Sequence, residues 1–369
     1  MLDIRLTRNR SRAVALVDLN QSAVSVAICR IEDDHALLAA SAYSALSLDG
    51  ASKDKGTAQL ASRVKEAGQK VTHAYSGPPI EAVYVIVHAP FISSRTMVAE
   101  THSDSQERIY DASIANMARE ALGKEQLDRA KLVEGSVVRI ELNGFPTQEP
   151  AGKWASQVRI ISLLSECDPE IRRLVEGEVN VLFPAGTVLW RSAIRACAAY
   201  GRSVDKLGEE YSILDMGATV SQVISVRSGE IESHMIDTGT SSILQKIAGG
   251  MSAEEALGAL RMIESGAASS ESVDALQKRM ALAEPDLVKT LADSISQIAA
   301  ERRISNSLLL LTHRDLEPWL TRVLSRIDFS QFTVTTLPFE IRTPQHANDT
   351  DAALAVNIAL VNSELSSAA

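Results

Sequence analysis

Two stretches of the sequence, 197 positions apart (215 − 18), repeat one pattern of apolar strand, aspartate and short turn. VALVDLNQS carries Asp18 at the end of its apolar run and Ser22 in the turn, and SILDMGAT carries Asp215 and Thr219 in the same places. In both cases the following strand resumes with β-branched residues. A period of about half the chain is too long for a solenoid repeat. The sequence therefore predicts two related half-domains.

Length and composition limit the class of protein. The chain has 369 residues and a mass of 39.8 kDa, and at roughly 150 residues per domain this predicts two or three folded units. Hydrophobic residues make up 45% and charged residues 23%, as in globular proteins that bury sizeable cores. The net charge of −10 disfavours nucleic-acid binding, because a phosphate backbone is held by a concentrated basic face.

The cysteines and the N-terminus point to a cytoplasmic protein. Cys29, Cys167 and Cys197 are odd in number, lie far apart and form no CxxC pair, so we expect buried reduced thiols rather than disulfides or a zinc site. The basic start MLDIRLTRNRSR is followed by an apolar run that breaks at Asp18, which is not a signal-peptide pattern. No run approaches the ~20 apolar residues of a membrane span, so we expect membrane contact only through a partner.

Apolar periodicity and turn residues divide the chain into segments. A β-meander over 13–46 and a helical stripe ending at Ala74 open the first half, and a second meander begins at Tyr211. Between the two meanders we expect a small insert, a strand over 179–183 and a helix over 186–200. Near the end of the chain, strand FTVTTLP precedes a last helix.

These elements predict the domain boundaries. The opening part of the first lobe covers 12–80, an inserted α+β module covers 81–180, and a connecting helix of the first lobe covers 181–210. The second lobe covers 211–340, with a short helical subdomain around 243–303, and a closing helix over 341–369 returns to the first lobe.

These segments predict an α/β fold with two lobes that face one another across a cleft. Backbone N–H groups of tight turns form concave anion sites, and a carboxylate beside them can hold a hydrated Mg²⁺. Asp18 and Asp215 are therefore the candidate metal ligands. The candidate phosphate-binding residues are Asn20, Gln21 and Ser22 in the first turn, Gly217, Ala218 and Thr219 in the second, and Gly239 further on.

Plainer interpretations exist for these residues. An aspartate before a single tight turn is more often hairpin chemistry than a metal ligand, and only the matched pair reverses that preference. Gly239 fits a simple strand-to-helix turn about equally well. The seven histidines are dispersed without an i,i+4 pair, so we expect all of them to be ordinary surface or core residues.

Several phrases resemble the actin-like ATPase superfamily, which includes sugar kinases, heat-shock chaperones, actin, and the FtsA and PilM proteins. VALVDLNQSAVSVAI resembles its first phosphate element, and ILDMGATVSQVISVRSGEI followed by IDTGTSSILQKIA resembles its second. The place of the insert and the phrases VYVIVHAPFISSRTMV and VRIELNGFPTQEPAGKWASQVRIISLL resemble the FtsA/PilM branch. The resemblance runs from Ala13 over nearly the whole chain. It implies a ribonuclease H-like fold with ATP and Mg²⁺ between the lobes.

Two departures from the superfamily pattern concern the nucleotide site. Asn20 stands where a glycine is usual in the first turn. After strand SLLLL, Thr312, His313 and Arg314 replace the glycine-rich turn that lets backbone approach adenosine. Three side chains at that point would narrow the nucleotide pocket or close it.

The resemblance implies a cytoplasmic scaffold or adaptor that joins division or type IV pilus machinery at the membrane face, and at most a slow ATPase. Its insert would bind a membrane-associated protein, and the resemblance also allows self-association. The tail NIALVNSELSSAA lacks the face of a membrane-binding helix, which favours the PilM side, whereas the insert phrases favour FtsA. The alternatives are a nucleotide-free structural scaffold and a small-molecule kinase, for which no substrate-binding segment is seen.

Overall fold

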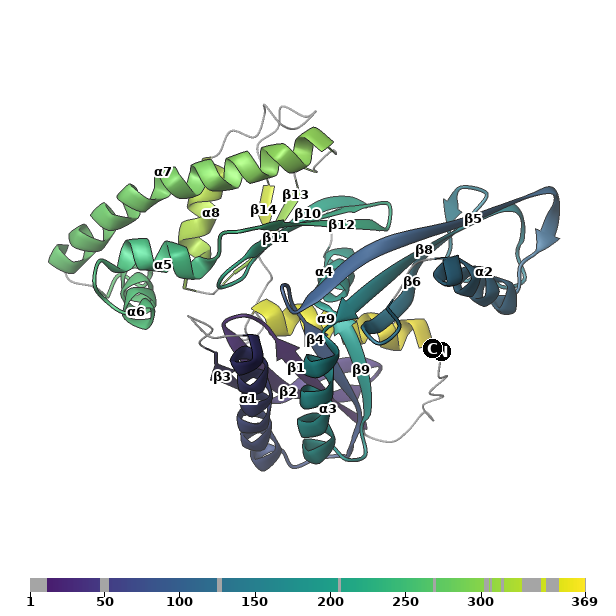
Figure 1. Cartoon of the computed structure of the whole chain (residues 1–369), viewed down its shortest axis with the longest axis horizontal. Coiled ribbons are helices and arrows are strands. Elements are labelled where there is room, and N and C mark those ends of the chain that lie inside the picture. The colour runs from purple at the N-terminus through teal and green to yellow at the C-terminus, as the bar shows by residue number, and fades with distance from the viewer. Residues whose placement is uncertain are drawn as a thin grey trace.

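Two five-stranded sheets with the same strand order form the body of the protein (Figure 1). The computed structural model describes residues 12–46, 53–124, 128–204, 207–267, 270–301, 305, 307–312, 315–326, 340–342 and 352–368. A smaller, four-stranded sheet extends to one side of the two main sheets. The predicted α/β class with two lobes and an insert is confirmed.

The first sheet has the order β3-β2-β1-β4-β9. Its strands are β1 (Arg12–Leu19), β2 (Ala23–Glu32), β3 (His35–Ala45), β4 (Ile80–Val87) and β9 (Thr187–Ser192). β1, β2 and β3 form the predicted antiparallel meander, and β4 and β9 run parallel to β1. β1 and β4 are buried almost throughout, as strands of a parallel layer covered on both faces are.

The second sheet repeats this order as β12-β11-β10-β13-β14. Its strands are β10 (Glu210–Met216), β11 (Ser221–Arg227), β12 (Glu230–Ile236), β13 (Ser307–Leu311) and β14 (Glu340–Arg342). β10 pairs antiparallel with β11 and parallel with β13, as β1 does with β2 and β4. Asp18 and Asp215 therefore hold equivalent positions near the ends of the central strands.

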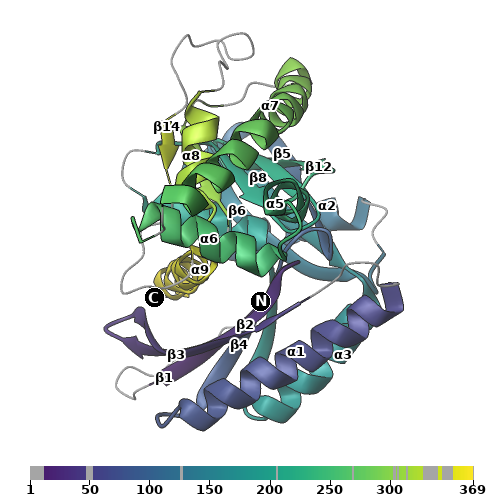
Figure 2. The ribbon, with the colours of Figure 1, turned by 90° about the vertical axis from the view of Figure 1, so that its left-hand side faces the viewer.

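Helices cover the outer faces of both sheets. In the first lobe, α1 (Lys53–Ala74) and α3 (Pro169–Leu182) lie side by side (Figure 2). The second lobe carries α5 (Thr240–Ala248), α6 (Ala253–Glu264), α7 (Ser270–Glu301) and α8 (Glu317–Ser325), so the helical subdomain predicted around 243–303 is present as α5, α6 and α7. The expected strand FTVTTLP, residues 332–338, lies outside the described residues.

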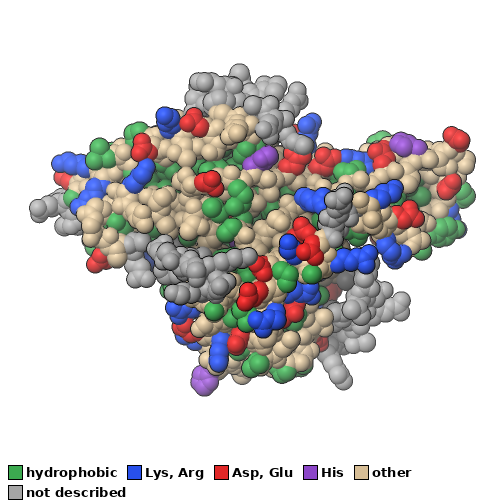
Figure 3. Space-filling view, viewed as in Figure 1, with side chains coloured by type: hydrophobic (Ala, Val, Ile, Leu, Met, Phe, Trp, Pro, Cys, Tyr) green, Lys and Arg blue, Asp and Glu red, His purple; other side chains and the backbone are tan. Residues whose placement is uncertain are grey.

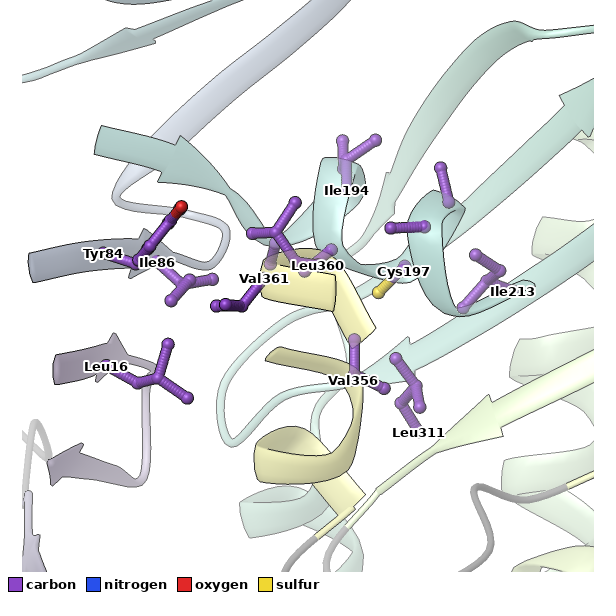
Figure 4. Close-up of a cluster of buried hydrophobic side chains, with 14 of the residues drawn as sticks. Leu16, Tyr84, Ile86, Ile194, Cys197, Ile213, Leu311, Val356, Leu360 and Val361 are labelled. Carbon is purple, nitrogen blue, oxygen red and sulfur yellow. The ribbon is translucent and has the colours of Figure 1, made fainter. Parts of the chain in front are cut away.

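Two helices pack between the lobes, α4 (Ala193–Ser203) and α9 (Ala352–Ala368). One buried apolar cluster joins them to both sheets (Figure 4). It contains Leu16 and Ile86 from the first sheet and Ile213 and Leu311 from the second, with Leu360 of α9 between them. The closing helix thus returns to the first lobe, where it packs against α4, β1 and β3.

The insert is smaller than the predicted 81–180. It consists of β5 (Ile92–Arg108), α2 (Asp111–Lys124), β6 (Leu132–Leu142), β7 (Phe145–Pro146) and β8 (Trp154–Cys167), in the sheet order β5-β8-β6-β7. β4 belongs to the first sheet, and α3 packs on α1. The apolar run of β4 is buried beside β1, and the buried face of α3 shares one cluster with α1, so burial assigns both to the lobe.

Two local expectations were wrong. Residues 179–183 were expected to form a strand, but α3 runs to Leu182 because Ile171, Val175 and Val179 repeat every four residues and bury one helical face. The helix expected over 186–200 begins only at Ala193, after β9 has paired with β4. Ser192 caps that helix by accepting a hydrogen bond from Arg195 N.

A buried glutamate joins the insert to the first lobe. The side chain of Glu134 on β6 is fully buried. It accepts hydrogen bonds from the backbone N–H and the hydroxyl of Ser192, both at 3.0 Å, and pairs with Arg195 Nη1 at 3.0 Å. A buried carboxylate needs such partners to offset its lost hydration. The base of the insert is therefore held firmly against the start of α4.

The insert also contacts the second lobe. Arg159 on β8 pairs with Glu230 of β12, and the Thr96 hydroxyl donates to the carbonyl of Ile231 at 3.0 Å. β5 and β12 lie next to one another along this border. The insert thus bridges both lobes, so a change in the angle between the lobes would disturb these contacts.

Candidate functional site

Asp18 lies at the end of β1, where the two lobes meet, and is 2% exposed. Its carboxylate accepts hydrogen bonds from His88 Nε2 at 3.1 Å, Asn357 Nδ2 at 2.6 Å and Asn20 Nδ2 at 3.2 Å. Burial opposes ionisation, but the charge of His88 and these hydrogen bonds outweigh it and lower the pKa of Asp18. Asp18 is therefore a carboxylate whose oxygens are already engaged by protein donors.

His88 stands between the two repeated aspartates. It follows β4 directly, and its Nδ1 lies 3.2 Å from Asp215 Oδ2 while its Nε2 contacts Asp18. Burial alone would lower the pKa of His88, but the charge of Asp18 and hydrogen bonds to both aspartates raise it well above its ordinary value. The raised pKa favours the protonated ring, and the two ring nitrogens contact one carboxylate of each lobe. We call this arrangement the Asp18–His88–Asp215 bridge.

The sequence predicted ordinary surface or core histidines rather than ligands, and His88 is a buried histidine whose contacts with both aspartates were not foreseen. The sequence shows a single histidine after the apolar run VYVIV, with no neighbouring ligand. Its role depends on β4 lying parallel to β1, which puts His88 N within 3.0 Å of the carbonyl of Leu19. Asn357 was missed as well, because it lies 339 residues from Asp18 in the chain.

In the first turn, residues 20–22, the side chain of Asn20 accepts hydrogen bonds from nearby backbone N–H groups. Asn20 Oδ1 accepts from Ser22 N at 2.9 Å, from the Ser22 hydroxyl at 2.9 Å and from Ala23 N at 2.8 Å. Asparagine readily forms such local turns. The donors predicted for a phosphate therefore have an acceptor within the turn itself.

Gln21 reaches from the first turn into the second, residues 217–220. The side chain is 4% exposed, and its Oε1 accepts from Thr219 N at 2.7 Å, the Thr219 hydroxyl at 2.6 Å and Val220 N at 3.0 Å. Its Nε2 donates to the carbonyls of Ala89 at 2.6 Å and Val220 at 3.2 Å. The carboxamide of Gln21 in the first lobe thus hydrogen-bonds to Thr219 and Val220 in the second lobe.

Small residues in the second turn make room for this contact. A Cβ on Gly217 would lie 2.5 Å from Gln21 Nε2 and 2.6 Å from the carbonyl of Val220. A Cβ on Gly239 would lie 2.2 Å from the carbonyl of Ala218, so this glycine brings backbone close to backbone. The next N–H groups, of Thr240 and Ser241 at the start of α5, donate to the carbonyls of Gly217 and Ala218.

The turn expected beside adenosine is described only in part. Thr312 follows β13 as His88 follows β4. The Thr312 hydroxyl is buried, and none of the described residues offers it a hydrogen-bond partner. His313 and Arg314 lie outside the described residues.

ATP and Mg²⁺ do not fit this arrangement of side chains. Four of the turn N–H groups, those of Ser22, Ala23, Thr219 and Val220, already donate to Asn20 or Gln21, and the His88 ring stands between the two carboxylates. No group of three or more His, Cys, Asp or Glu side chains in the described part of the chain is arranged to hold a metal ion. A cavity of about 310 Å³ lies at the ends of α1 and α3, and one of about 190 Å³ lies between β12 and α7; neither is lined by the bridge residues.

Within the described ranges, no helix combines the length and apolar character that crossing a bilayer requires. α9, which contains most of the tail examined for membrane binding, instead buries Val356, Asn357, Leu360 and Val361 against the lobes. Its Glu364 pairs with Arg191 and Arg195. This helix therefore belongs to the core between the lobes.

Comparison with known proteins bears on the fold. No family model matches the sequence, and no curated protein matches it. The chain is similar to a solved chain of a PilM–PilN type IV pilus biogenesis complex, with 14% identity over 94% of this chain and 97% of that chain and a TM-score of 0.55. The ethanolamine utilization protein EutJ from Carboxydothermus hydrogenoformans matches at 12% identity over 96% of this chain and 91% of its own, with a TM-score of 0.49.

Identities this low inform on the fold alone. The PilM–PilN likeness covers both lobes and the insert, and it agrees with the repeated strand order of the two main sheets. The resemblance noted in the phosphate elements of the sequence agrees with it as well. The chain thus shares the two-lobed fold of the solved PilM–PilN chain, as the resemblance to the actin-like ATPase superfamily implied.

Proposed function

We propose that this protein is an FtsA- or PilM-like scaffold or adaptor that joins a membrane-associated protein to cell-division or type IV pilus machinery at the cytoplasmic face of the membrane. The main support is the insert, which is fixed to both lobes at its base and carries exposed aromatic side chains at its outer end. A rigid body with one such end suits an assembly role better than turnover of a small molecule.

The outer end of the insert is set by the strand register. β8 runs from Trp154 to Cys167, and its Cys167 end lies near the first lobe, while Trp154 pairs with Arg108 at the far end. Phe145 is the first residue of β7, after the turn that follows β6, and is 76% exposed. Trp154 is 61% exposed and Tyr110 is 55% exposed. Large exposed aromatic side chains mark partner sites more often than chance. We call Tyr110, Phe145 and Trp154 the aromatic end of the insert.

The charge distribution fits a protein partner better than nucleic acid. On the face seen in Figure 3, basic and acidic side chains alternate without forming a basic stripe, and hydrophobic side chains lie among them at the end of the insert. Arg108 lies over the Tyr110 ring at 5.9 Å, which holds this aromatic ring in place. Mixed charge around aromatic side chains is typical of the rim of a protein interface.

Membrane contact is proposed to pass through the partner. The apolar residues Val356, Leu360 and Val361 of α9 are buried between the lobes and are therefore not available to lipid. We expect the purified chain not to pellet with anionic vesicles unless a membrane-anchored partner is present. Strong pelleting of the chain alone would contradict this part of the proposal.

The proposal can be tested by site-specific photocrosslinking in the native host. A photoreactive residue in place of Phe145 should capture a protein of the membrane fraction, and one in place of Trp154 should capture the same protein. The matched control is Val181 on α3, which is 76% exposed but lies on the first lobe away from the insert. Equal capture from all three positions, or none from the insert, would refute a role for the aromatic end. A positive screen for phosphorylation of a small metabolite would favour the kinase alternative instead.

A further inference from the structure

Backbone N–H groups that could hold a nucleotide's phosphates already have side-chain acceptors in both turns. In an anion site, the N–H groups of tight turns point at the bound oxygens. Here Ser22 N and Ala23 N donate to Asn20 Oδ1 in the first turn, and Thr219 N and Val220 N of the second turn donate to Gln21 Oε1, over 2.7 to 3.0 Å. Both acceptors are neutral amide oxygens supplied by the first lobe.

The place of a metal ion between Asp18 and Asp215 is also taken by a side chain of the protein, that of His88. A Mg²⁺ ion demands near-octahedral oxygen ligands and usually keeps several waters. The bridge offers instead one flat imidazole ring, whose Nε2 lies 3.1 Å from Asp18 Oδ2 and whose Nδ1 lies 3.2 Å from Asp215 Oδ2. Asn357 and Asn20 occupy further lone pairs of Asp18. A metal ion would have to displace His88 and compete with both amides.

We infer that this chain joins its lobes with its own side chains and without a nucleotide, with Gln21 in place of a phosphate acceptor and His88 in place of the metal cation. Each lobe supplies a side chain that contacts the other lobe. Gln21 of the first lobe contacts Thr219 and Val220, and Asp215 of the second lobe contacts His88. The buried apolar cluster around α4 and α9 also joins the two lobes, because it contains residues of both sheets. This inference does not depend on the partner proposed above.

The rival possibility is a nucleotide site that is merely shut in this conformation. ATP would then have to open the lobes and replace the five hydrogen bonds of Gln21 before binding. Its apparent affinity would fall by the fraction of molecules that are open. The two possibilities differ in one observable, which is whether millimolar Mg-ATP stabilises the full chain.

The experiment is a thermal-unfolding titration of the full-length wild type with Mg-ATP and Mg-ADP. A ligand at a hundred times its dissociation constant shifts the folding equilibrium about a hundredfold, which a melting curve detects easily. We expect no shift at millimolar nucleotide. A rise in the Tm of the wild type with either nucleotide would overturn the inference, and this arm needs no variant.

A second arm tests whether Gln21 holds the lobes together. Gln21→Ala should lower the Tm and increase the radius of gyration measured by small-angle X-ray scattering, because the second turn loses its acceptor. The matched control is Gln157→Ala, since Gln157 donates its amide to Glu100 on the exposed face of the insert. If Gln21→Ala does not fold, Gln21→Met, which keeps the length of the side chain, replaces it. A Gln21 variant with the Tm and radius of gyration of the control would refute the bridging role.

Discussion

The first and second turns share a backbone plan but differ in the side chains placed on it. Both follow the central strand of a five-stranded sheet and both come after an aspartate. The first turn carries amide side chains that accept hydrogen bonds, whereas the second carries Gly217, Ala218 and Thr219 and offers bare N–H groups. The comparison shows that, after a duplication, a side chain of one turn can take the place of a bound anion in the other turn. Here Gln21 of the first turn accepts the N–H groups of Thr219 and Val220.

The same asymmetry separates the two aspartates and gives the largest predicted effect. Asp18 is 3% exposed in its side chain and receives three side-chain donors, while Asp215 is 16% exposed and receives His88. Asp18→Ala should cost about 3–5 kcal/mol, because it removes one of the two carboxylates that face the buried His88 ring and the shared acceptor of the Asn357 and Asn20 amides. Asp215→Ala should cost only about 1–2 kcal/mol. Urea unfolding measures both, and equal losses would show that the two lobes contribute alike.

The second prediction concerns the close approach in the second turn. Gly217→Ala places a Cβ against Gln21 and against the carbonyl of Val220, so we expect a loss of about 1–3 kcal/mol. Gly123→Ala is the control, since a Cβ there meets nothing within 4 Å and alanine favours the helix. A Gly217 variant as stable as the Gly123 variant would mean that the contact with Gln21 adapts freely.

The third prediction is a pH dependence of stability that His88→Gln should remove. The pKa of His88 is raised in the folded protein, so its stabilisation is complete below the unfolded value of about 6.5 and fades as the pH rises toward the folded value, by up to about 1.4 kcal/mol per pH unit. The pKa of Asp18 is lowered, so its part is present above about 3.9 and is lost as the pH falls toward the folded value. The stability difference between wild type and His88→Gln should therefore be greatest at about pH 4–6.5. Chemical unfolding at pH 6 and pH 9 tests this, and an unchanged difference would contradict it.

The smallest expected effect concerns Asn20. Asn20→Gly restores the residue usual in the superfamily and frees Ser22 N and Ala23 N. We expect a loss of about 0.5–1 kcal/mol, as for a capping side chain, which is less than the loss from Gln21→Ala. A loss larger than that of Gln21→Ala would place the main support of the turns within the first lobe rather than between the lobes.

Much of the fold could be predicted from local pattern. The repeat around Asp18 and Asp215 predicted two matched meanders, and both formed because alternating apolar residues and tight turns are local signals. The extent of the insert could not be predicted so well. β4 and α3 have the same apolar character as strands and helices of the insert, and only pairing with β1 and packing on α1 assign them to the lobe.

The sequence predicted that Asp18 and Asp215 face one another, but not which side chains lie between and around them. The sequence singled out Asp18 and Asp215, and the structure brings both to His88. It could not reveal that Gln21 would meet the second turn, since an amide in a turn serves equally as donor and acceptor. His88 and Asn357 were missed because their approach to Asp18 depends on distant pairing, which leaves no mark in the neighbouring residues.

The last described helix also affects how the protein is made. Asn357 of α9 donates to Asp18 across 339 residues of chain, and Leu360 and Val361 complete the cluster between the lobes. The first sheet is complete at Ser192 and α9 begins only at Ala352, so the part of the sheet that α9 covers stays exposed while the second lobe is synthesised. Chaperone dependence during translation is the expected result of such distant contacts.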